Sequence, residues 1–184
     1  MIKNWMAAGL GIIGFVVSAS AYADTQTITT SQADFNVSPG DTIEFDVTYA
    51  YSGPSYTTGL GLKLYFDSSK LSLLEVSGVF PIDKIAQSES ADSGDGDGDS
   101  ATDKKLNVAW TSLSGKWPGS DNAGTKLYTI KFKVEEGFSS STVINFTGDA
   151  SAGNTFSASP VAISSYKDNK AAQMMTIVTH YILF

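Results

Sequence analysis

The sequence has no cysteine, no arginine and only one histidine among its 184 residues. Without cysteine the chain can form no disulfide and carry out no thiol chemistry. Nucleic acids are bound mainly through basic surfaces, and this chain combines a net charge of −7 at pH 7 with no arginine. We therefore expect no nucleic-acid partner. An acidic chain can instead attract cations.

The single histidine, His180, also limits the catalytic options. Ser-His-Asp and Cys-His mechanisms and histidine-based metal sites need a histidine beside a second group, and no G-x-S-x-G motif precedes His180. Gly94, Gly96 and Gly98 do not lead from a strand into a helix, as nucleotide-binding loops do. We predict that the chain is not an enzyme. A glycosidase-like carboxylate pair stays open, because aspartate and glutamate are plentiful.

The first 23 residues have the pattern of a secretory signal peptide. Lys3 gives a positive start, residues 6–17 are apolar, and Ala21-Tyr22-Ala23 is a small-x-small cleavage site. The apolar run is too short to span a membrane comfortably, so we expect cleavage rather than a membrane anchor. The pattern predicts a secreted protein, located outside the cell, at its surface or in the periplasm, with no stable membrane span in the mature chain.

The remaining chain is dominated by period-two alternation of apolar and polar residues, which is typical of half-buried strands. Alternating or strand-like runs lie at residues 43–51, 60–66, 71–76, 106–111, 128–134, 144–146 and 161–163. A further strand is expected within 25–37, and 82–87 has a weak helical pattern. Short strands between glycine- and serine-rich turns predict an all-β fold, an antiparallel β-sandwich over 24–165. A closed barrel is the alternative. Residues 166–184 are either a final strand or the end of a longer chain.

One segment, Ser88 to Asp103, is rich in aspartate, serine and glycine. Its candidate Ca²⁺ ligands are Asp92, Asp95, Asp97, Asp99 and Asp103. Calcium takes six to eight oxygen ligands, which a Gly-Asp-Gly-Asp loop can supply from carboxylates and carbonyls. Ser100 and Leu106 occupy positions where an EF-hand needs glycine and glutamate, so the segment is not an EF-hand. A weak extracellular Ca²⁺ site and a solvated acidic loop are both compatible with this composition.

Aromatic residues offer a second kind of site. Trp117, Tyr56 and Tyr65 are candidate sugar platforms, because Trp117 and Tyr56 fall in loops and Tyr65 alternates away from Leu64. Each could instead cover one end of the sandwich. Trp110 shares a face with the apolar positions of its strand and is expected in the core.

The order of strands and turns resembles the cohesin domain family. The resemblance covers residues 25–164. Its motifs are Pro39-Gly-Asp-Thr-Ile43, Gly61-Leu-Lys-Leu-Tyr-Phe-Asp67 and the strand-like segments at 71–76, 105–110, 124–134 and 156–163. The resemblance implies a nine-stranded jelly-roll sandwich that binds without catalysing. It also implies a protein partner such as a dockerin, in assemblies that degrade plant cell walls.

The family carries an asparagine and an aspartate at its dockerin-binding strand, and the matching positions here are Gly59 and Gly61. The proline that follows the acidic corner in the family is Ser68. The resemblance places a protein partner on one outward sheet face. The residues expected there are Lys63, Tyr65, Asn107, Thr111, Thr129, Lys131 and Lys133. A polysaccharide bound by Trp117 with Tyr56 or Tyr65 is the alternative ligand.

Overall fold

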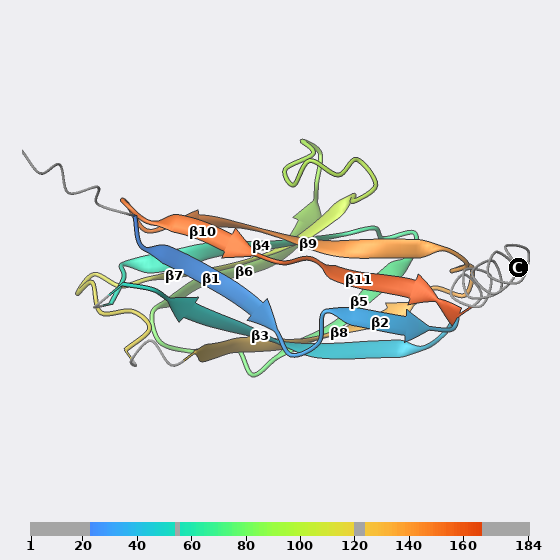
Figure 1. The fold of residues 1–184 in the computed structure, drawn as a ribbon, viewed down its shortest axis with the longest axis horizontal. Coiled ribbons are helices and arrows are strands. Elements are labelled where there is room, and N and C mark those ends of the chain that lie inside the picture. The colour runs from blue at the N-terminus through green and yellow to red at the C-terminus, as the bar shows by residue number, and fades with distance from the viewer. Residues whose placement is uncertain (1–22, 54–55, 120–123, 167–184) are drawn as a thin grey trace, which may run out of the picture.

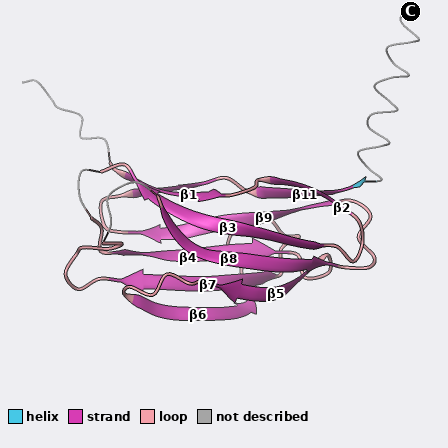
Figure 2. Cartoon of the chain, turned by 90° about the horizontal axis from the view of Figure 1, so that it is seen from below, coloured by secondary structure: helices cyan, strands magenta, loops and turns pink. Residues whose placement is uncertain are grey.

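The computed structural model describes residues 23–53, 56–119 and 124–166, which form eleven strands in two sheets. The sheets pack face to face, with their strands running along the length of the molecule (Figure 1). Strands are joined by turns and loops (Figure 2). Except for Ala23 and Tyr166, the expected signal peptide and tail lie outside the described residues. Within those residues, no helix has the length and hydropathy of a membrane span.

The five strands of sheet A follow the order β10-β1-β3-β8-β5, and the six of sheet B the order β2-β11-β9-β4-β7-β6. In sheet A the bounds are β10 Thr155–Ala158, β1 Thr25–Thr30, β3 Thr42–Tyr51, β8 Thr125–Val134 and β5 Leu71–Ser77. In sheet B they are β2 Asp34–Val37, β11 Val161–Ser165, β9 Ser141–Ala150, β4 Gly59–Phe66, β7 Lys104–Thr111 and β6 Lys84–Ala91.

The predicted all-β sandwich is confirmed, and the two separate sheets exclude the closed barrel. The strand count is eleven rather than nine because both ends of the fold are split. The expected strand within 25–37 is β1 in sheet A followed by β2 in sheet B, and the closing strand is likewise divided into β10 and β11. The chain thus passes from one sheet to the other between β1 and β2, and again between β10 and β11, and all four strands lie at the same edge of the sandwich.

The sheets are mixed rather than purely antiparallel, which corrects the prediction. β1 pairs with β10 in parallel, and β2 pairs with β11 in parallel, while the other pairs are antiparallel. Period-two alternation reports which side chains are buried. It carries no information on the direction of the neighbouring strand.

The weak helical pattern at 82–87 is wrong, because this segment enters strand β6. β6 pairs with β7 along its length, with an irregularity between Lys84 and Ala86 that accommodates Ile85. All eight residues of β6 are exposed, so no alternating apolar face marks the strand in the sequence. Backbone pairing at a sheet edge, not side-chain burial, determines this element.

The core follows the alternation of the long strands. Ile43, Phe45, Val47 and Tyr49 of β3 are all 3 % exposed or less. Burying each side chain of this size stabilises the fold by about 1.5–3 kcal/mol relative to leaving it in water. The expected core position of Trp110 is confirmed at 1 % exposure.

Candidate functional site

The outward face of sheet B carries four of the seven residues predicted to bind a partner. Lys63 and Tyr65 lie on β4, and Asn107 and Thr111 lie on the neighbouring β7. Cross-strand pairing places Lys63 directly opposite Asn107, and Tyr65 opposite Lys105. These side chains therefore share one surface.

The other three predicted residues lie on the opposite side of the molecule, so the single face was wrong. Thr129, Lys131 and Lys133 belong to β8 in sheet A. Alternation showed correctly that they point outward, but it could not assign strands to sheets. Lys131 lies 2.8 Å from a carboxylate oxygen of Glu44, and this contact raises the pKa of Lys131.

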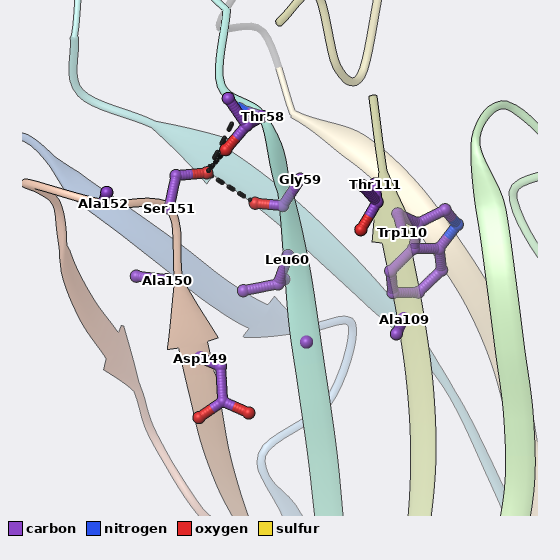
Figure 3. Close-up of a pocket in the computed structure, with 11 residues that line it drawn as sticks. Thr58, Gly59, Leu60, Ala109, Trp110, Thr111, Asp149, Ala150, Ser151 and Ala152 are labelled. Atoms are coloured by element: carbon purple, nitrogen blue, oxygen red, sulfur yellow. Dashed lines mark hydrogen bonds between the residues drawn. The ribbon is translucent and has the colours of Figure 1, made fainter. Parts of the chain in front are cut away.

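A hollow of about 360 Å³ lies on the outward face of sheet B, at the end where β4 begins. Asp149 of β9 and Ala109 of β7 are the cross-strand neighbours of Gly61, and they stand on either side of β4 in Figure 3. Thr111 and Ser151 add polar groups to the lining. The hollow exists because Gly61 and Ala109 place almost no side chain on this part of the face.

Gly59 and Gly61, which match the partner-binding positions of the cohesin resemblance, differ in whether a side chain could replace them. Gly59 has a φ of +135°, and a Cβ there would lie 2.1 Å from the carbonyl oxygen of Trp110. No side chain fits at that distance, so the backbone itself requires glycine. A Cβ at Gly61 would lie 3.3 Å from Oδ2 of Asp149, the end of a flexible side chain. Gly61 is therefore open to substitution, and its missing side chain forms the hollow.

An ion pair borders the hollow. Nζ of Lys63 donates to Oδ2 of Asp149 at 3.0 Å, and this hydrogen bond raises the pKa of Lys63. The side chains are 35 % and 76 % exposed respectively. Exposed pairs of this kind contribute at most about 1 kcal/mol, so both charges are available to a partner at little cost.

A buried polar network fixes the backbone beneath the hollow. The side chain of Gln26 is fully buried and donates to Tyr49 Oη at 3.0 Å and to the carbonyl of Gly59 at 2.9 Å. Its oxygen accepts from the amide of Ser151 at 2.6 Å. The Ser151 hydroxyl also donates to the Gly59 carbonyl at 2.9 Å (Figure 3). Strands β1, β4 and the end of β9 are thereby held in fixed relation.

Gln26, Asp149 and Asn145 were not among the predicted site residues. A usable signal was present for each. Gln26 lies two residues before Ile28 and so shares its inward face, while Asn145 and Asp149 lie on the face of their strand opposite to the buried Ile144. The short apolar run at 144–146 concealed that β9 extends to Ala150.

Two of the three candidate sugar platforms are wrong. Trp117 is fully buried, because its loop folds back through paired backbone hydrogen bonds with Thr57, and its ring packs 4.6 Å from that of Tyr49. Tyr65 is 2 % exposed, and of these three residues only Tyr56, at 41 %, has an exposed ring. The three aromatic residues do not form a platform.

Tyr65 points outward and is nevertheless buried, because the acidic loop, residues 92–103, covers it. A Cβ built on Gly96 would lie 2.7 Å from Oη of Tyr65, so the glycine backbone rests against the ring. Thr147 of β9 donates to Tyr65 Oη at 3.3 Å. In Figure 1 this loop, between β6 and β7, stands above the upper sheet.

Four of the five aspartates of the acidic loop accept hydrogen bonds from protein groups instead of converging on one point. Their acceptor contacts are Asp92 with the Gly96 amide and Lys105, Asp97 with Thr102 and Asn145, Asp99 with the Ala101 amide, and Asp103 with Ser68. Asp95 stands on the exposed side. Among the described residues, no three acidic or histidine side chains are arranged to hold a metal. Calcium binding stays a prediction that would require this loop to rearrange.

Hydrogen bonding also lowers the pKa of two aspartates in the acidic loop. The Gly96 amide, followed by Lys105, lowers the pKa of Asp92. The Ser68 hydroxyl and amide, each 2.7 Å from an oxygen of Asp103, lower the pKa of that carboxyl. Both contacts are therefore stronger while the carboxylates are ionised.

No protein-family model and no curated protein sequence matches the chain. Among solved structures, a novel type I cohesin–dockerin complex of Clostridium thermocellum, Coh-OlpC with Doc435, matches with a TM-score of 0.51 and 14 % identity. The match covers 78 % of this chain and 95 % of that one. The fold is cohesin-like. A complex of CaCohA2 with CaDoc0917 matches with a TM-score of 0.50 and 14 % identity, over 77 % of this chain and 99 % of that chain.

Proposed function

We propose that this chain is an exported, non-catalytic module that holds a protein partner on the outward face of sheet B. The observation that carries the proposal is the hollow beside Gly61, on a cohesin-like fold. The two similar solved structures described above are complexes of a cohesin with a dockerin, which supports a dockerin-like partner. A link to polysaccharide degradation is the further part of the proposal, and its support is the sequence resemblance to cohesins alone. The signal-peptide pattern of residues 1–23 supports export.

The hollow implies a reversed mode of contact. Family resemblance expects side chains at positions 59 and 61 to reach toward the partner, yet both are glycine. A partner must therefore supply a projecting side chain that fills the space between Asp149 and Ala109. Anchor residues that fill a pocket dominate the binding energy of most protein interfaces. At the edge of the hollow, Lys63 and Asp149 can then give up their mutual contact and pair with charged groups of the partner.

The hollow does not support glycoside hydrolysis. That reaction needs two carboxyl groups facing the same bond, about 5–10 Å apart. Among the described residues, Asp149 is the one acidic residue lining the hollow, and it is paired with Lys63. We therefore propose binding without catalysis at this site.

The test is site-directed photo-crosslinking in the culture fluid of the source organism. A photoreactive amino acid replaces Asn107, beside the hollow, and in a matched control it replaces Lys131 on the outward face of sheet A. In the culture fluid, we expect one protein to be crosslinked through position 107 and not through position 131. The purified CaDoc0917 and Doc435 dockerins serve as defined probes in the same assay. Crosslinking to no protein, together with retention on insoluble polysaccharide, would contradict the proposal and favour sugar binding.

A further inference from the structure

The acidic loop occupies the same face that is proposed to bind the partner. The hollow lies at the β4 end that begins with Gly59, whereas Tyr65 lies near the other end of the strand. Lys63 lies between them, with Asn107 and Thr147 as its cross-strand neighbours. One part of the face is thus open, and the part around Tyr65 is covered.

The base of the loop is firmly closed. The Asp92 amide donates to the Asp103 carbonyl at 2.8 Å, and the Asp103 amide donates to the Phe66 carbonyl at 3.2 Å. Asp103 also accepts two hydrogen bonds from Ser68 at 2.7 Å. These contacts continue the β6–β7 pairing and tie the base to the end of β4.

The part of the loop that covers Tyr65 is held by few contacts. Gly96 touches the ring, and Oδ2 of Asp97 accepts from Asn145 Nδ2 at 2.8 Å. A Cβ on Gly94 or Gly98 would meet nothing within 4 Å, so the loop faces open space at these two positions. Segments with few buried apolar contacts open at lower free energy than the rest of a fold.

We propose that the acidic loop is a displaceable cover of the partner-binding face. When it lifts, Tyr65 and Asn145 join the hollow in one continuous surface across β4 and β9. The partner that displaces it carries lysine or arginine side chains, because these compete with Asn145 and Lys105 for the carboxylates of Asp97 and Asp92. Tyrosine rings of this kind are frequent anchors of protein interfaces. This inference rests on the proposed function for its biological role, but loop displacement can be measured without a partner.

The first test measures the nitration of tyrosine by tetranitromethane on the full exported chain, with peptide mass spectrometry. The absence of cysteine removes the main competing reaction of this reagent. Tyr56, at 41 % exposure, is the internal exposed reference, and the fully buried Tyr128 is the internal protected one. In the unmodified chain we expect Tyr65 to react more slowly than Tyr56 and faster than Tyr128.

Two glycine variants separate the contact from the loop itself. Gly96→Val drives a side chain into the Tyr65 ring, whereas Gly94→Val adds the same atoms where no neighbour lies within 4 Å. We expect Gly96→Val to raise the nitration rate of Tyr65 by about tenfold, since local opening controls access, and Gly94→Val to leave it unchanged. Asp97→Asn, which weakens the contact with Asn145, should raise it by a smaller factor and serves if Gly96→Val fails to fold.

The second test has two parts. Nitration is first repeated with decalysine at low salt, as a model of a basic partner, and crosslinking through position 107 is then compared between the variants and the unmodified chain. Decalysine should accelerate nitration of Tyr65 but not of Tyr128, and Gly96→Val should increase crosslinking through position 107. If Tyr65 stays unreactive with decalysine and also in the Gly96→Val and Asp97→Asn variants, the loop is a fixed cover and the inference is wrong. It is equally wrong if Tyr65 reacts like Tyr56 at the outset, or if a captured partner binds Gly96→Val and the unmodified chain equally. Capture of no protein, with the nitration results as expected, would contradict the proposed function alone.

Discussion

The outward faces of the two sheets are built from similar alternating strands but form different surfaces. On sheet A, lysines and acidic residues pair across neighbouring strands, as Lys126 does with Asp46 at 2.7 Å and Lys131 with Glu44 at 2.8 Å. On sheet B, small residues leave a hollow at one end, and a loop covers a tyrosine at the other. A surface whose groups satisfy one another gains little from a partner, whereas unfilled space and covered aromatic area provide binding energy.

The largest expected effect concerns the backbone beneath the hollow. Gly59→Ala should destabilise the fold by more than about 3 kcal/mol, because its Cβ meets a backbone carbonyl in a left-handed conformation. Gly61→Ala should cost less than about 1 kcal/mol, because the one close neighbour is a flexible carboxylate. Urea unfolding of both variants measures the difference. Equal stabilities would show that the two glycines are not distinguished by the backbone.

The buried network should have the next largest effect. Gln26→Ala removes a side chain that satisfies Tyr49, Gly59 and Ser151, and should destabilise the chain by about 2 kcal/mol through unpaired buried groups. Thr29→Ala, at an exposed position of the same strand, should change stability by less than about 0.5 kcal/mol. A loss below that of the control would mean that water replaces the glutamine.

The hollow itself is tested by filling it. Gly61→Phe should reduce partner crosslinking through position 107 by about tenfold, as loss of one anchor pocket does, with unfolding free energy nearly unchanged. Lys131→Ala on sheet A should leave crosslinking as it is. If the two substitutions reduce capture equally, the contrast between the faces has no functional meaning.

The pH dependence of folding stability should report on the contact between Asp103 and Ser68 at the base of the acidic loop. Because the pKa of Asp103 is lowered in the folded chain, its contribution to stability is present above the ordinary aspartate pKa and is lost as pH falls through the lowered value. Asp103→Asn should therefore be less stable than the unmodified chain near neutral pH. The two should converge once the pH has fallen below the lowered pKa of Asp103. Melting curves across this range measure the gap, and a gap independent of pH would exclude the ionised contact with Ser68.

Calcium should have the smallest effect. We expect weak, millimolar binding that is lost when Asp95, Asp97 and Asp99 are changed together to asparagine, since carboxylate oxygens provide the ligands. Binding must break the contact between Asp97 and Asn145, so Ca²⁺ should also accelerate nitration of Tyr65. Calorimetry that detects no heat at millimolar Ca²⁺ would contradict the calcium prediction.

The buried half of the fold could be predicted from the sequence, because hydrophobic burial acts through local period-two alternation. Phe45, Leu62 and Phe132 are core residues, as their positions indicated. The sheet to which each strand belongs could not be predicted, since it depends on long-range pairing. Lys63 and Lys131 were consequently grouped on one face although they lie on opposite sheets.

The candidate site was predictable only in part, and the errors have a common cause. Trp117 and Tyr65 were candidate sugar platforms because a loop position and an outward strand position are ordinarily exposed to solvent, with covering one end of the sandwich as the alternative. In the structure, one loop folds inward onto Tyr49, and another folds over the sheet onto Tyr65. Loop paths of this kind are determined by tertiary contacts that leave no periodic signal in the sequence.

The parallel pairing of β1 with β10 and of β2 with β11 has a mechanical consequence. The start of β1 and the end of β11 lie at opposite ends of the long axis of the sandwich (Figure 1). Tension applied between them pulls the first and last strands past each other, along their length and across their hydrogen bonds. Many bonds must then shear together instead of separating one by one from an end. A domain connected in this way resists extension along its own axis more strongly than tension that peels a single strand from an edge.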